Sequence, residues 1–200
     1  MFPLGTVLLP RAHLPLHIFE ERYRALARDC LAGDRSFGVV LIERGQEVGG
    51  GDVRFSVGTV ARITQAVELP DGRWLLDAVG TERIRILDWL PDEPYPRAEV
   101  ETLADDPAGP EAEDLRAGVE RLLRQVLALE VELGYPAPAA TVTIDADPGR
   151  AAFEAALLSP IGPMDTQRLL ELCRPEDRLR AVRDCLEDVR DTLARRIAEG

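Results

Sequence analysis

The sequence contains no lysine, because all 24 basic residues are arginine. Chemistry that needs a lysine amine is therefore excluded, including Schiff bases, a Ser–Lys dyad and the Walker A contact to nucleotide phosphates. Asparagine is absent as well, and serine occurs only at Ser36, Ser56 and Ser159, never inside a G-x-S-x-G turn. We therefore expect neither a P-loop nucleotide hydrolase nor an ordinary serine hydrolase.

Long apolar runs and cysteines are also scarce. Hydrophobic residues make up 46% of the 200 residues, but their runs fall far short of the roughly 20 that a membrane span needs. The apolar stretch 2–9 is broken by Pro3, has no basic residue before it and does not resemble a signal peptide. The three cysteines form no C-x-x-C pair and fit free thiols in a reducing compartment. These features predict a cytoplasmic protein that does not bind membranes.

Positive charge is in deficit, and the deficit is concentrated in the second half of the chain. Residues 1–98 carry 12 Arg against 14 Asp and Glu, a net charge of −2, and residues 99–200 carry 12 against 22, a net charge of −10. A nucleic-acid partner needs a basic patch that neutralises phosphates. The charge therefore argues against nucleic-acid binding.

The first half of the chain has the pattern of a small β unit. One amphipathic helix is predicted at 18–31, ending at Gly33 in a left-handed conformation, and 10–15 reads as a proline-rich connector. Along 54–69, alternation places every second residue from Phe55 to Leu69, including Val67, on one face. Strands are predicted at 2–9 (an edge strand, because of Pro3), 36–43, 54–69, 73–79, 83–90 and 97–103, with a turn at Pro70-Asp71-Gly72 and a loop at 47–52.

The second half of the chain reads as helices only. Residues 104–110, rich in Asp, Pro and Gly, predict a linker. Helices are predicted from Pro110 or Glu111 to Leu133, from Asp147 as N-cap to Pro160, from near Asp165 to Leu172, and from Pro175 onward. The last helix carries an apolar seam formed by Leu179, Val182, Leu186, Val189, Leu193 and Ile197. This seam predicts the core of a small helical bundle, or alternatively a coiled-coil contact with a second chain.

No group of residues forms a convincing catalytic or metal-binding pattern. His13 and His17 have a spacing of four and, with Cys30, are the only metal-ligand candidates, but Pro15 opposes a shared helix face. The acidic pairs at 20–21, 105–106 and 187–188 read as solvated charge, because neighbours on a helix point in different directions. Trp74 and Trp89 lie on predicted strands and read as sheet-face residues. We therefore predict no catalytic residue, no cofactor and no metal.

Several motifs nevertheless resemble one known family. They are Phe2-Pro3-Leu4-x-x-Val7-Leu8-Leu9-Pro10, Leu14-Pro15-Leu16-x-Ile18-Phe19-Glu20-x-Arg22-Tyr23, Val57-Gly58-Thr59-Val60-Ala61-x-Ile63, Leu69-Pro70-Asp71-Gly72, Val79-Gly80-Thr81-x-Arg83-Ile84-x-Ile86, Asp165-x-Gln167-x-Leu169-Leu170-Glu171 and Arg178-Leu179. In this order they resemble the N-terminal substrate-binding domain of the Lon protease, above all its stand-alone bacterial relatives.

The resemblance implies an α+β fold. A PUA-like β pseudo-barrel with one packed helix is expected over residues 1–104, followed by a helical bundle over 110–200. The matching positions are mostly those that make the fold: apolar residues for the core, and Gly58, Gly72 and Gly80 for turns or close backbone approach. Glu20 and Arg22 are expected to form a structural ion pair, with Arg83 or a terminus as a further partner.

By resemblance the chain is a non-enzymatic polypeptide-binding or adaptor module without the ATPase and peptidase. Expected partners are unfolded or tagged polypeptides and an ATP-dependent protease, with an apolar groove at the junction of barrel and bundle as the binding region. Three alternatives stay open: a self-associating or partner-docking scaffold, which includes a homo-oligomer; an enzyme with a metal at His13 and His17; and, by analogy with other PUA-like folds, RNA binding, which the charge opposes.

Overall fold

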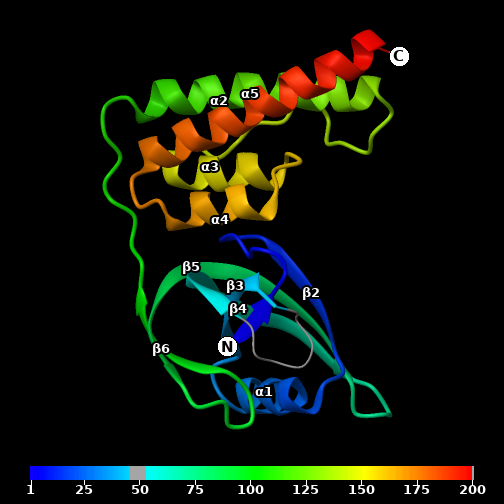
Figure 1. The fold of residues 1–200 in the computed structure, drawn as a ribbon, viewed down its shortest axis with the longest axis vertical. Coiled ribbons are helices and arrows are strands. Elements are labelled where there is room, and N and C mark those ends of the chain that lie inside the picture. Colours follow the sequence, from blue (N-terminus) through cyan, green and yellow to red (C-terminus); the bar gives the residue numbers. More distant parts are fainter. Residues whose placement is uncertain (46–52, 200) are drawn as a thin grey trace. The chain divides into compact units, whose positions relative to one another are not determined.

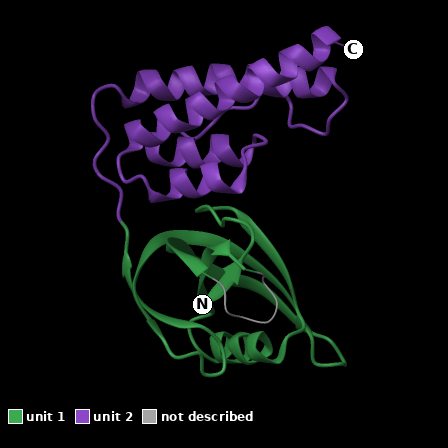
Figure 2. Cartoon of the chain, in the orientation of Figure 1, with its two compact units in different colours: residues 1–103 green, residues 104–200 purple. Residues whose placement is uncertain are grey.

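The computed structural model describes residues 1–45 and 53–199, so the loop predicted at 47–52 lies outside the described residues. Contacts divide the chain into two compact units, residues 1–103 (unit 1) and 104–200 (unit 2), shown in Figure 2.

Unit 1 is a strongly curved mixed sheet with one helix, α1 (Glu21–Ala32). Its strands are β1 (Phe2–Leu4), β2 (His13–Ile18), β3 (Ser36–Arg44), β4 (Val53–Glu68), β5 (Trp74–Leu90) and β6 (Arg97–Thr102). The order is β1-β3-β4-β5-β2, with β6 also on β5; β1 and β3 are parallel and the other pairs antiparallel. As Figure 1 shows, the long strands β4 and β5 bend around the core and α1 lies across one end. The predicted α+β class is confirmed.

Two predicted strand boundaries were wrong. Residues 13–18, mostly read as connector, form β2; Pro15 fits because β2 is an end strand of the sheet, where its missing N–H breaks no ladder bond. The two strands predicted at 73–79 and 83–90 are one strand, β5, which exchanges one partner for another along its length. Pro3 does lie on an end strand, but β1 stops at Leu4.

Close backbone contacts hold the irregular segment after β1 against the sheet. A Cβ on Gly80 would lie 2.3 Å from the carbonyl oxygen of Leu9, so only glycine fits there. The buried Thr59 hydroxyl donates a 2.5 Å hydrogen bond to the carbonyl oxygen of Leu8. Gly72 has φ +79° in the predicted turn, whereas Gly33 has φ −107° and Arg35 instead takes the left-handed conformation at φ 64°. The predicted left-handed Gly33 was wrong.

Unit 2 consists of four helices, α2 (Ala112–Glu132), α3 (Pro148–Leu157), α4 (Pro163–Glu171) and α5 (Pro175–Glu199), drawn in Figure 1. The predicted cap is confirmed, because the Asp147 side chain accepts a hydrogen bond from the Arg150 N–H at 2.9 Å. In the seam of α5, Leu179, Val182 and Leu186 are fully buried and Leu193 nearly so. The seam therefore forms the core of the unit, as the bundle interpretation predicts. No described helix has the length and apolarity to cross a bilayer.

The segment predicted as a linker is hydrogen-bonded to the helices of unit 2. Asp105 receives two hydrogen bonds from Arg178, at 2.7 and 3.1 Å, and the Asp106 N–H donates to the carbonyl oxygen of Cys173 at 3.0 Å. The Gly109 N–H donates to the buried carboxylate of Glu176. These bonds assign the start of the segment to the helical unit.

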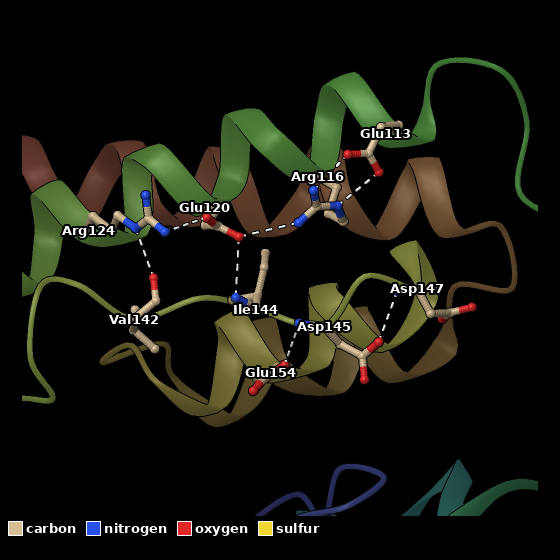
Figure 3. Close-up of polar contacts among 9 residues, drawn as sticks. All are labelled: Glu113, Arg116, Glu120, Arg124, Val142, Ile144, Asp145, Asp147 and Glu154. Atoms are coloured by element: carbon tan, nitrogen blue, oxygen red, sulfur yellow. Dashed lines mark hydrogen bonds and ion pairs between the residues drawn. The ribbon is translucent and has the colours of Figure 1, made fainter.

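A network of carboxylates and arginines fixes the long connection between α2 and α3 (Figure 3). Glu120 accepts hydrogen bonds from Arg124 at 2.5 Å, from Arg116 at 3.3 Å and from the Ile144 N–H at 3.3 Å. Arg124 also donates to the carbonyl oxygen of Val142 at 2.8 Å. Backbone groups of this connection, such as the Val142 carbonyl and the Ile144 N–H, thus form hydrogen bonds with side chains instead of with a helix or strand. Glu120 therefore has a structural role.

Candidate functional site

The histidine pair lies on the outer face of β2. His13 and His17 are both exposed and share a face because side chains alternate along a strand. Four residues of strand separate them by roughly 13 Å, and Cys30 is buried, with its thiol donating to the carbonyl oxygen of Ser36 at 3.2 Å. The structure therefore does not bring the three together. Within residues 1–45 and 53–199, no three His, Cys, Asp or Glu side chains form a group that could hold a metal ion.

The acidic residues predicted as solvated or linker charge pair with arginines, and for Asp105 the prediction was wrong, because it accepts two hydrogen bonds from the fully buried Arg178. Glu21 lies 3.0 Å from Arg24, and Glu187 lies 3.9 Å from Arg183, both along their own helices. The exposed pairs of Glu21 and Glu187 stabilise the fold little.

The predicted ion pair of Glu20 and Arg22 forms at 3.1 Å, while Arg83 is buried in β5. The guanidinium of Arg22 also lies 4.4 Å from the ring centroid of Tyr23, and Tyr23 stacks on Phe2 at 4.2 Å. These contacts link Glu20, Arg22, Tyr23 and Phe2 next to the end of β2.

Both tryptophans are partly buried sheet residues, as predicted. Trp74 packs against the core of unit 1. The guanidinium of Arg54 lies over the ring of Trp89, 4.4 Å from the ring centroid. Because this cation covers Trp89, its ring is not an open platform for a ligand.

An exposed apolar row crosses three strands of unit 1 and is here called the apolar stripe. In register, His17 of β2 lies beside Leu75 of β5, which lies beside Val67 of β4. Phe19 extends the row beyond β2, with its ring centroid 6.2 Å from that of His17. Phe19 and Val67 are each 55% exposed and Leu75 is 45% exposed. Contiguous exposed apolar groups of this kind are typical of binding surfaces.

The stripe adjoins an open pocket of about 230 Å³ lined by residues of β1 and β2. Phe2 and Leu4 of β1 line it on one side and Leu16 and Ile18 of β2 on the other, and Phe19 of the stripe also lines it. The lining is mainly apolar, so the pocket suits a hydrocarbon side chain.

The edge of β2 that faces away from β5 offers main-chain hydrogen-bonding groups. The Gly80 N–H of β5 donates to the carbonyl oxygen of Ala12 at 2.9 Å. Since antiparallel ladders alternate, Leu14, Leu16 and Ile18 bond to β5, whereas the backbone groups of His13, Pro15 and His17 point to the other edge. No described strand pairs with that edge. It can therefore accept an extended chain by strand addition.

The sequence pattern misplaced Val67. Alternation from Phe55 places Val67 on the same face as Val57 and Ile63, which are buried. A register shift between Ile63 and Gln65 then reverses the two faces, so that Ala66 packs inward and Val67 outward. Local alternation carries no signal for such a bulge, because the bulge depends on how the partner strand pairs.

Comparison with known proteins identifies the family. The model of the ATP-dependent protease La (LON) substrate-binding domain matches residues 1–188. The chain is 30% identical to Lon protease 2 of Herpetosiphon aurantiacus over 193 residues, 95% of this chain but 23% of that protein. It is 26% identical to the LON peptidase N-terminal domain and RING finger protein C14F5.10c of Schizosaccharomyces pombe, over 88% of this chain and 42% of that protein.

Solved structures have the same fold. The Lon N-terminal domain protein of Xanthomonas campestris matches with a TM-score of 0.64 and 30% identity, over 90% of this chain and 92% of that one. The N-terminal domain of the Mycobacterium avium complex Lon protease matches in fold, with a TM-score of 0.67 and 22% identity, over 93% and 97% of the two chains. The chain spans about a quarter of the length of the Lon proteases it matches, 23% in the Herpetosiphon protein. With the match to residues 1–188, it belongs to the Lon substrate-binding domain family.

Proposed function

We propose that the chain is a non-enzymatic module that captures extended, apolar segments of unfolded polypeptide on unit 1. The observation that carries this proposal is the position of the apolar stripe and its pocket directly beside the unpaired edge of β2. The stripe and its pocket would bind the side chains of the captured polypeptide, and the edge of β2 would form hydrogen bonds with its main chain.

The two parts of the site serve different purposes. Main-chain hydrogen bonds to His13 and His17 would be the same for any sequence, which suits a module that binds many polypeptides. Burial of side chains on Phe19, Leu75 and Val67 would select apolar segments, since each buried methylene contributes about 0.8 kcal/mol. A folded protein hides both its apolar side chains and its strand edges, so unfolded segments are preferred.

The partner that receives the captured chain is proposed from the family. Its matching model is named for substrate binding by an ATP-dependent protease, and the Herpetosiphon relative is a Lon protease. The chain has no lysine for a Walker A loop or a Ser–Lys dyad, which supports a role in recognition rather than catalysis. We therefore propose delivery of polypeptides to an ATP-dependent protease. The groove expected at the junction of the two units stays a prediction.

The first experiment measures binding of a permanently unfolded protein, reduced and carboxymethylated α-lactalbumin, by fluorescence anisotropy. We expect a Kd of tens of micromolar or tighter, about −6 kcal/mol or better. The double variant Val67→Thr, Leu75→Thr should weaken binding at least about fivefold, because it removes apolar surface from the stripe. The matched control is Leu87→Thr, Val100→Thr, which changes residues 58% and 42% exposed elsewhere on β5 and β6.

A second pair of variants tests the strand edge. His17→Pro removes an N–H that does not bond to β5, and His17→Ala keeps that N–H while removing the same ring. Weaker binding by His17→Pro than by His17→Ala, with equal thermal stability, supports strand addition. Absence of binding by the wild type up to about 100 μM, or equal losses in the stripe and control variants, would overturn the proposal.

A further inference from the structure

A second cleft lies in unit 2 and shares no residue with the apolar stripe. Its volume is about 490 Å³, within the range of ligand-binding sites. It is lined by Glu130 near the end of α2, by Tyr135 after that helix, by Pro160, and by Asp188, Leu193 and Arg196 of α5. Its lining combines a mainly apolar surface with a few polar groups, the composition of a site that takes an apolar stem with one polar end.

Glu130 is a half-buried carboxylate in the lining of the cleft. Burial alone raises the pKa of its carboxyl group above the ordinary value. Across residues 1–45 and 53–199, no hydrogen bond or ion pair satisfies this carboxylate. A partly desolvated carboxylate without a partner is stabilised when a cation approaches it.

The cleft contains one cation among its lining residues, Arg196, and its described hydrogen bond goes to the neutral side chain of Tyr135. The guanidinium of Arg196 donates to the hydroxyl oxygen of Tyr135 at 3.0 Å, which holds the Tyr135 ring as a wall. Asp188 adds a second carboxylate to the lining. The surrounding field has the same sign, because residues 104–200 carry 12 Arg against 20 Asp and Glu, a net charge of −8. The cleft therefore attracts positive charge.

From this geometry and charge we propose that the cleft binds a basic side chain, by its aliphatic stem and its charged end, within an apolar segment of another polypeptide. The stem packs between Tyr135 and Leu193, and the charged end lies against Glu130. Lysine fits this role because its flexible stem buries along apolar surface while its ammonium reaches a single carboxylate. None of the 200 residues of the sequence is lysine, so no residue among them can fill this role.

The experiment uses the full chain and two probe peptides. One is fluorescently labelled Phe-Ala-Lys-Ala-Leu with blocked termini, and the other replaces its lysine with norleucine, which keeps the stem and removes the charge. We expect the lysine peptide to bind at least about fivefold more tightly than the norleucine peptide at low salt, and the difference to shrink at 0.5 M salt.

Variants locate the binding. Glu130→Gln should remove the preference for lysine, whereas Glu132→Gln, an equal change of charge at an exposed position outside the cleft lining, should keep it. Thermal melts check that both variants remain folded. Val67→Thr, Leu75→Thr should leave the preference unchanged, so failure of this proposal and failure of the proposed function are distinguishable.

Equal affinity for the two peptides, or an unchanged preference in Glu130→Gln, would overturn the proposal. Butylamine that displaces the lysine peptide at the peptide's own Kd would also overturn it, because the site would then recognise a free amine.

Discussion

Arg178 of α5 holds Asp105, 73 residues away in the sequence, through two hydrogen bonds of 2.7 and 3.1 Å. Arg178 is fully buried, and its guanidinium also donates to the carbonyl oxygens of Gly149 and Leu172 and lies 4.0 Å from the ring centroid of Phe153. One side chain thus joins the segment before α2 to α3 and to the end of α4. A buried guanidinium needs such a set of acceptors, because an unpaired charge in the interior is costly.

The first prediction concerns this pair. Asp105→Ala should lower the free energy of unfolding by about 2–3 kcal/mol, because it leaves the buried charge of Arg178 without its counter-ion. We place the value at the low end because the Asp105 side chain is 38% exposed. Urea unfolding measures the effect, and Asp106→Ala is the control, since the Asp106 side chain is exposed. Equal losses in the two variants would contradict a specific role for Asp105.

The second prediction concerns the connection between α2 and α3. Glu120→Ala should lower the free energy of unfolding by about 1–2 kcal/mol, because the Ile144 N–H and two arginines lose their shared acceptor. Amide hydrogen exchange at Ile144 should become faster than exchange in the buried part of α2. Glu113→Ala serves as the control, because Glu113 is exposed and contacts Arg116 alone among the bonds described for it. If exchange at Ile144 is unchanged in Glu120→Ala, the network does not hold this segment.

The third prediction concerns the anchor of the segment that follows β1. Thr59→Val keeps the shape of the side chain but leaves the buried carbonyl of Leu8 without its donor. We expect a loss of about 1–2 kcal/mol in the free energy of unfolding. Thr81→Val removes a similar 3.0 Å bond to the carbonyl oxygen of Val60 at an exposed position, where water replaces it, and should cost less than about 0.5 kcal/mol. Chemical denaturation of the two variants side by side is the measurement.

The fourth prediction concerns Cys30. Burial raises the pKa of its thiol from 9.0 to about 11. The unfolded chain therefore releases this proton at lower pH than the folded chain, so the contribution of Cys30 is fully present below pH 9.0 and is lost as the pH rises toward 11. At pH 10 the loss should be about 1 kcal/mol.

Comparison of wild type with Cys30→Ala at pH 8 and pH 10 isolates this effect, since the variant lacks the titrating group. The wild type should lose more stability between the two pH values than the variant does. Alkylation of the native protein should also modify Cys173, which is partly exposed, before Cys30. Rapid alkylation of Cys30 in the folded state would show that the thiol is not buried as described.

Much of the fold follows from local pattern. Apolar spacing predicts the four helices of unit 2, and the cap at Asp147 and the turn at Gly72 are set by side chains that act within a few residues. The strand at 13–18 was missed because Pro15 signals a connector locally, and only the sheet shows that Pro15 lies on an end strand.

The candidate site depends more strongly on tertiary structure. The sequence by itself determined the α+β class and the family resemblance, and its lack of lysine excludes a Walker A lysine and a Ser–Lys dyad within these 200 residues. The tertiary structure decided that Val67 faces outward beside Leu75 and His17, because a bulge in β4 reverses its faces. It also decided that Arg83 and Arg178 are buried, and that the Glu130 carboxylate has no partner among the described residues. Exposure and pairing depend on residues far apart in the chain, and local spacing does not encode these contacts.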